Sequence, residues 1–241
     1  MNNAELFNEL KNRHIKFEKR ENSLEAFSNE MNFYESFIPY FFSKNGEADN
    51  IKNMYENINY DMEDHCEKSI SCIDVNRCYD VYKEYVDGMM KFIVDICENG
   101  NNDKKLDAFE SKLDIAKNND AIFIESLYAG KIPDYTIHEK PLSEAVQNIE
   151  FLIDFIPQLS VLKENCSSLA NKIVDCETIN KRKEELLIES MGMLYNSIDQ
   201  YCYGTLYNIL TDYQKINNVL EESTEPSYPK KKKDNDAFVL L

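Results

Sequence analysis

Three histidines and seven cysteines are the side chains with the most specific chemistry, and their spacing limits what they can do. Asp61 and His65 are four residues apart and would share one face of a helix. A zinc site is usually built on close cysteine pairs, whereas Cys72 and Cys78 are six residues apart. The spacing therefore predicts buried thiols and a surface histidine, with no bound metal. The full cluster comprises Asp61, Asp64, His65, Cys66, Cys72 and Cys78.

The other two histidines offer little for catalysis. His14 falls on the apolar stripe of the first predicted helix, where a core or interface role is the simpler interpretation. His138 precedes Glu139 in an irregular segment, which leaves open a local acid/base pair or a solvated loop. The sequence contains no phosphate-binding loop, no GxGxxG motif, no GxSxG elbow and no HExxH motif. We therefore predict no catalytic residue and no cofactor.

Cysteine usage and the absence of long apolar runs indicate a reducing compartment. Seven cysteines make an odd number with no compact framework, which favours free thiols over disulfides. Residues 1–17 contain no apolar signal-peptide core, and no stretch approaches the roughly 18 apolar residues of a membrane-spanning helix. We expect an intracellular, cytoplasmic protein.

The charge balance narrows the choice of partners. The chain carries 44 acidic and 27 basic side chains, a net charge of −17. Nucleic acids and anionic membrane surfaces would repel such a molecule at long range. We therefore expect protein partners, with no general nucleic-acid binding and no membrane binding.

Composition and periodicity predict an all-α protein. Six glycines and six prolines in 241 residues provide few turns, and apolar residues recur at steps of three and four over long stretches. We expect one elongated bundle of about five long, kinked amphipathic helices over residues 1–222. The apolar stripes of the predicted helices cover residues 7–45, 51–73, 78–96, 103–127, 141–176 and 187–220, with the second and third helices either separate or joined. The last helix should extend beyond its stripe to more than 40 residues.

Local signals mark where these helices begin, bend and end. Pro39 should kink or end the first helix, Asp103 should cap a later one, and Pro157 should bend another. Pro141 fits the first turn of its helix. The least regular stretch, residues 130–141, is the best candidate for a short extended piece.

Residues 223–241 depart from the helical pattern and form a predicted flexible or partner-docked tail. Removing the four lysines and two aspartates of residues 230–241 leaves 23 basic and 42 acidic side chains, a net charge of −19. The positive charge of the tail therefore complements the negative charge of the helical part of the chain, and it would equally complement an acidic partner. Its predicted partner-binding residues are Lys230, Lys231, Lys232, Lys233, Phe238, Val239, Leu240 and Leu241. The lysine run also matches a nuclear-import signal, which adds the nucleus as an alternative location.

These features favour a non-enzymatic structural or assembly protein. Long amphipathic helices either pair with each other or leave a seam that another chain completes. We expect the protein to bind partner proteins, or further copies of itself, through helical seams and the apolar C-terminal anchor. The setting would be a larger complex, either a viral particle or an intracellular assembly.

Two alternatives remain. The long helices, the prolines at positions 39 and 157 and the stretch 141–163 resemble the helical BAR domains, which implies a dimeric module on a curved membrane surface. Those domains use basic membrane-facing surfaces, whereas this body is strongly acidic. The other alternative is an enzyme with an unrecognised helical active site, which predicts a pocket converging on His65 or His138.

Overall fold

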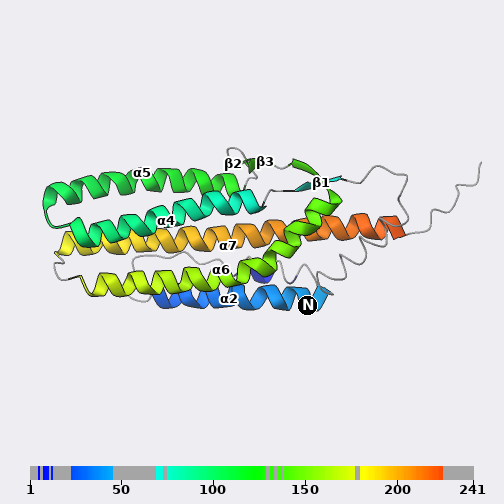
Figure 1. Cartoon of the computed structure of the whole chain (residues 1–241), viewed down its shortest axis with the longest axis horizontal. Helices are drawn as coiled ribbons and strands as arrows, with labels where there is room; N and C mark the ends of the chain where they lie inside the picture. Colours follow the sequence, from blue (N-terminus) through cyan, green and yellow to red (C-terminus); the bar gives the residue numbers. More distant parts are fainter. Residues whose placement is uncertain are drawn as a thin grey trace, which may run out of the picture.

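The computed structural model describes residues 5, 8–10, 12, 23–45, 69–72, 75–128, 131–132, 135–136, 138–176 and 180–224. Within these residues the protein is all-α, as the sequence predicted. Beyond the helical residues at 5, 8–10 and 12, five long helices form an elongated bundle (Figure 1). They are α2 (Ser23–Asn45), α4 (Val75–Asn99), α5 (Asp103–Tyr128), α6 (Leu142–Val174) and α7 (Lys181–Thr224).

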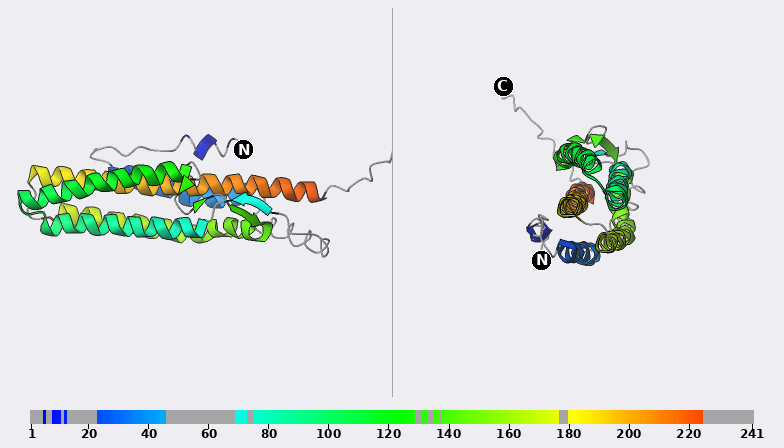
Figure 2. Two further views of the ribbon diagram at one scale, coloured as in Figure 1. Left: turned by 90° about the horizontal axis from the view of Figure 1, so that it is seen from above. Right: turned by 90° about the vertical axis from the view of Figure 1, so that its left-hand side faces the viewer.

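Helix α7 is the centre of the bundle. Seen end-on, α5, α4, α6 and α2 form an arc around it (Figure 2, right). The sequence predicted a final helix of more than 40 residues, and α7 has 44. Because neighbours cover α7 on several sides, it buries polar side chains such as Ser197 and Asp199 beside its apolar ones. Asp199 accepts a hydrogen bond of 2.5 Å from the Tyr34 hydroxyl of α2, which satisfies one of these polar groups.

Side-chain contacts fix the direction of each helix. Phe27 stacks on Tyr195 and Phe41 meets Tyr213, so α2 runs parallel to α7. Lys117 of α5 pairs with Glu189 and Arg182 with Glu110, so α5 also runs parallel to α7. In contrast, α4 meets α7 in the reverse order, with Tyr82 stacked on Tyr201 and Cys97 beside Lys183. Tyr79 of α4 meets Phe151 of α6, and Cys97 lies beside Cys176, so α4 and α6 are neighbours that run in the same direction (Figure 2, right).

Two small sheets accompany the helices. Strand β1 (Ser69–Cys72) pairs antiparallel with β4 (His138–Pro141), and β2 (Lys131–Ile132) pairs with β3 (Tyr135–Thr136). The extended piece predicted within residues 130–141 is confirmed. The helix predicted over residues 51–73 is wrong at residues 69–72, because Ile70 and Cys72 are buried in alternation with Ser69 and Ser71 and follow the period of a strand. The other residues of that prediction lie outside the described residues.

Helix ends and prolines largely follow the sequence. Helix α2 continues through Pro39 and ends at Asn45, within the predicted stop. Asn102, one residue before the predicted Asp103, caps α5 by accepting a hydrogen bond of 3.1 Å from the Lys105 amide. Figure 1 shows α6 bending partway along its length, and Pro157 lies inside it. Pro141 occupies the N-cap position of α6, one residue earlier than predicted.

Candidate functional site

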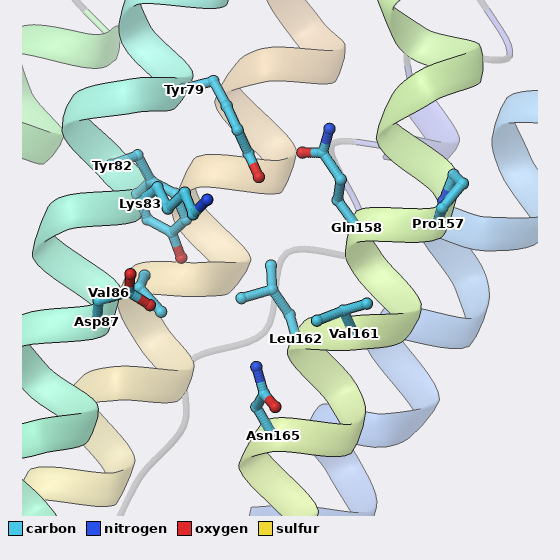
Figure 3. Close-up of a pocket in the computed structure, with 10 residues that line it drawn as sticks. All are labelled: Tyr79, Tyr82, Lys83, Val86, Asp87, Pro157, Gln158, Val161, Leu162 and Asn165. Carbon is cyan, nitrogen blue, oxygen red and sulfur yellow. The ribbon is translucent and has the colours of Figure 1, made fainter.

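A cleft opens between the middle portions of α4 and α6 (Figure 3). It encloses about 240 Å³, enough for one or two side chains of another molecule. We call it the α4–α6 cleft and define it by ten lining residues. These are Tyr79, Tyr82, Lys83, Val86 and Asp87 from α4, and Pro157, Gln158, Val161, Leu162 and Asn165 from α6.

The two walls of the cleft are joined at both ends of the helix pair. Strand β1 precedes α4 and strand β4 precedes α6, so the β1–β4 ladder holds the two helix starts together. At the other end, the Cys176 thiol following α6 lies 3.4 Å from the Cys97 carbonyl oxygen of α4. Helix α6, which contains Pro157, bends between these two points of contact, and the cleft lies in the same region.

The floor of the cleft is an aromatic cluster formed with α7. The Tyr82 ring is 1% exposed and stacks on Tyr201 at 3.7 Å with an interplanar angle of 4°. Phe155 of α6 meets the edge of Tyr201 at 5.7 Å, and Tyr79 meets Phe151 at 5.9 Å. Such ring pairs contribute about 0.5–1.5 kcal/mol each beyond the area they bury. The floor is therefore a fixed surface held by the protein's own contacts.

The lip on the α6 side is apolar and open to solvent. Val161 lines the cleft and is 55% exposed, and Ile153, two turns earlier, is 52% exposed. The exposed Pro157 lies between them at a spacing of four residues, so the three share one face of α6. Exposed apolar groups that adjoin a cleft are typical of binding surfaces.

A few polar groups accompany this apolar lining. The amide of Gln158 points across the cleft toward Tyr79 (Figure 3). Its Oε1 atom is buried and has no hydrogen-bond partner among the described residues. A buried acceptor of this kind costs about 1–3 kcal/mol when it is left unsatisfied. Lys83 and Asp87 stand at the rim and are exposed.

The phenols of the floor remain protonated at neutral pH. Burial raises the pKa of Tyr82 well above its ordinary value of 10.0, and nearby thiol and phenol groups add to the rise. Burial also raises the pKa of Tyr79, helped by the carboxylates of Asp80 and Asp87. The floor therefore presents neutral aromatic rings, which suits an apolar ligand group better than acid/base chemistry.

The residues singled out from the sequence for chemistry do not gather in this cleft. Strand β4 places His138 opposite Cys72, while the neighbouring Glu139 carboxylate accepts a hydrogen bond from Ser71 of β1. Burial is the main cause that raises the pKa of Cys72 to about 11. Cys72 and Cys78 are buried and form no disulfide. Among the residues described, no group of three or more histidine, cysteine or acidic side chains could hold a metal ion.

Other predicted sites fall outside the described residues. They are His14, the cluster members Asp61, Asp64, His65 and Cys66, and the tail residues Lys230, Lys231, Lys232, Lys233, Phe238, Val239, Leu240 and Leu241. No helix in the described part of the chain has an apolar stretch that could cross a bilayer.

The chain matches no protein-family model, no curated protein and no solved structure. What the cleft can bind must therefore be inferred from its own side chains. The cleft combines neutral rings at the floor, exposed aliphatic groups at the lip and one buried amide oxygen without a hydrogen-bond partner among the described residues, a lining that could accommodate an apolar group carrying a hydrogen-bond donor.

Sequence reasoning predicted some of these residues and missed the site. The helix predicted over residues 78–96 contains Tyr82, and a bend was predicted at Pro157. Gln158 and Val161 carried no signal, because a helix period tells which face is buried but not which helix lies beside it. The signal that could have located the cleft is the proline inside a long apolar helix, since it is where packing along the helix is interrupted.

Proposed function

We propose that the protein is a non-enzymatic assembly component whose α4–α6 cleft binds an apolar, basic segment of a partner protein. The observation that carries the proposal is an open apolar cleft with a fixed aromatic floor and exposed aliphatic groups at its lip. Anchors in such pockets supply most of the free energy of many protein complexes. The elongated bundle would present this site along its side (Figure 1).

The apolar part of the proposed segment follows from the lining. A cleft of about 240 Å³ accommodates an aliphatic or aromatic side chain, and the stripe of Ile153, Pro157 and Val161 extends the contact along α6. An amphipathic helix laid along this stripe would place its apolar face on these residues. A donor beside the anchor would satisfy the Gln158 Oε1 atom.

The basic part follows from charge. Over the span of the cleft the two helices carry five exposed carboxylates against one exposed lysine, Lys83. The carboxylates are those of Asp80, Glu84, Asp87, Asp154 and Glu164. With a net charge of −17, the whole molecule would attract a basic segment at long range and speed its association.

The tail is the second docking element in this proposal. Its lysine run and apolar residues bind another surface of the assembly, in line with the chemistry predicted for residues 230–241. Because the same chemistry suits the α4–α6 cleft, a neighbouring copy's tail is one of the partners to be tested.

The experiment is co-purification from the source's own lysate with four baits. These are the full chain, a chain ending at Pro229, the cleft variant Val161→Lys and the control Ile115→Lys. Ile115 is 63% exposed on α5, away from the cleft, so the control adds the same charge to a comparably exposed site. We expect one stoichiometric partner with the full chain and the control, and at least a tenfold loss of affinity for Val161→Lys measured with the purified partner.

Four outcomes distinguish the parts of the proposal. Equal recovery by Val161→Lys would remove the cleft from the interface. Loss on truncation at Pro229 alone would assign binding to the tail, whereas loss with both variants would assign it to both elements. If the full chain is recovered without any partner, the assembly function itself fails.

A further inference from the structure

Two thiols meet where α4 and α6 end. Cys97 lies two residues before the end of α4, and Cys176 lies two residues after the end of α6. The Cys176 thiol donates a hydrogen bond of 3.4 Å to the Cys97 carbonyl oxygen, and the proximity of Cys176 also contributes to the raised pKa of Cys97. Contact at this range between residues 79 positions apart places both sulfurs in one corner of the bundle.

The corner is tightly built, which holds the thiols in place. Lys183 of α7 is 1% exposed and donates a hydrogen bond of 2.7 Å to the same Cys97 carbonyl. A Cβ atom at Gly100 would lie 2.6 Å from the Ile96 carbonyl oxygen and 3.4 Å from Lys183 Cε, so only glycine fits the turn after α4. Backbone and lysine therefore pin the position of Cys97 relative to Cys176.

These two thiols differ from the other described cysteines in access. Cys97 and Cys176 are half-buried, whereas Cys72, Cys78, Cys166 and Cys202 are buried. Burial raises the pKa of Cys97, and Cys176 adds to the rise, while Lys183 and Lys172 lower it. Burial raises the pKa of Cys97 overall, which lowers its thiolate fraction at neutral pH, so exchange is favoured by the contact between the two residues and by the partial access of both thiols.

We propose that Cys97 and Cys176 form a redox-active pair that closes to a disulfide by exchange with a small-molecule disulfide of the oxidised-glutathione class. The thiolate of one cysteine attacks a sulfur of the reagent, the reagent's S–S bond breaks, and one glutathione leaves as a thiol. The second cysteine then attacks the protein sulfur of the mixed disulfide and releases the other glutathione. Two protein thiols are oxidised and one disulfide is reduced, so atoms and electrons balance.

The disulfide would tie the end of α4 to the end of α6. These helices form the walls of the α4–α6 cleft, and the β1–β4 ladder already joins their starts. Closing a loop of about 80 residues restrains the unfolded chain strongly, and for a chain of this size we expect the Tm to rise by about 5–10 °C. The proposal concerns the thiols alone and stands whether or not the cleft binds a partner.

The test uses the full chain in mixtures of reduced and oxidised glutathione. Free thiols are alkylated, the protein is unfolded and reduced, and the released thiols are labelled with a second reagent for peptide mapping. We expect Cys97 and Cys176 to acquire the second label together, and we expect a Cys97–Cys176 linked peptide in a parallel digest that is not reduced, as well as a higher Tm. The control Cys78→Ser should keep both the linked peptide and the Tm shift, and Cys97→Ser or Cys176→Ser should lose both.

Two results would overturn the proposal. One is that Cys97 and Cys176 carry only separate glutathione adducts, or stay reduced, when the mixture is fully oxidised. The other is a linkage of either residue to a different cysteine. Both are read on the wild-type chain, so a variant that fails to fold does not obscure the answer.

Discussion

The floor and the lip of the α4–α6 cleft are both apolar, yet they have opposite environments. Tyr82 at the floor is 1% exposed and stacked on Tyr201, whereas Val161 at the lip is 55% exposed. The floor is held by contacts that the protein makes with itself. The lip keeps aliphatic surface in water, where it adds nothing to folding.

This difference separates stability from recognition within one site. Residues of the floor hold α4, α6 and α7 together, so changes there should act on unfolding first and on binding only as a consequence. Residues of the lip lie outside the core, so changes there should act on binding while the free energy of unfolding stays constant. Gln158 lies between the two, with a buried oxygen that folding leaves unsatisfied.

Replacing the floor ring should have the largest effect. Tyr82→Ala removes a fully buried ring and its stack on Tyr201, and we expect a loss of about 3–5 kcal/mol in the free energy of unfolding. Urea titration followed by circular dichroism measures it. The control Tyr40→Ala, on a tyrosine that is 37% exposed, should cost under about 1 kcal/mol. Equal losses in the free energy of unfolding for the two variants would contradict the conclusion that Tyr82 at the floor stabilises the fold.

Alkaline pH should weaken the core next to the floor. Burial raises the pKa of Cys166 to about 12 and is the main cause that raises that of Cys72 to about 11, from an ordinary 9.0. The folded protein thus keeps protons that the unfolded chain releases above pH 9, so stability is complete below this pH and falls as pH rises. We expect a loss of about 2–4 kcal/mol between about pH 8 and about pH 10.5, measured by urea titration under reducing conditions.

The floor itself adds a second step to this pH dependence. The pKa of Tyr82 is also raised, so its contribution is lost as pH rises above about 10, where an unfolded tyrosine ionises. Tyr82→Phe should therefore flatten the upper part of the profile while changing stability at neutral pH by no more than about 1 kcal/mol. If the free energy of unfolding stays constant from about pH 8 to above about pH 10, the Cys72 and Cys166 thiols and the Tyr82 hydroxyl are hydrated in the folded protein.

Gln158→Met should stabilise the free protein by about 1 kcal/mol and weaken partner binding. The change removes a buried oxygen that has no partner among the described residues and keeps the length of the side chain. Methionine and glutamine have similar helix propensities, so the effect is assigned to the oxygen. Gln147→Met, at an exposed position of the same helix, should change stability by less than about 0.5 kcal/mol. A destabilised Gln158→Met would mean that the oxygen is satisfied in solution.

Much of the fold could be predicted from the sequence, because one signal dominates it. Apolar residues at steps of three and four continue through most of α7, and Leu187, Leu194 and Ile198 of the predicted segment 187–220 are all fully buried. The incorrect helix prediction at Ile70 arose from relying on the same periodic signal. A run of four residues, Ser69–Cys72, is too short to distinguish a strand from a helix by period alone.

The cleft could not be predicted, because it depends on which helices are neighbours. Periodicity places Tyr82 on a buried face, but the packing of α4 beside α6 is decided by their contacts with α7 and by the β1–β4 ladder. For the same reason Cys97 and Cys176, 79 residues apart, look unrelated in the sequence. Polar lining residues such as Gln158 resemble any solvated helix position until the neighbouring helix is known.

Charging the lip should have the smallest effect on folding and the clearest effect on binding. Val161→Lys places an ammonium where the valine is already 55% exposed, so we expect the free energy of unfolding to change by less than about 0.5 kcal/mol. Binding of an apolar fluorescent dye should drop markedly, because dyes of this kind occupy exposed apolar clefts. Ile115→Lys should leave dye binding unchanged, since Ile115 does not line the cleft. If both variants bind the dye equally, Val161 contributes no more to binding than an isolated exposed aliphatic residue does. The lip would then have no role in recognition that distinguishes it from the floor.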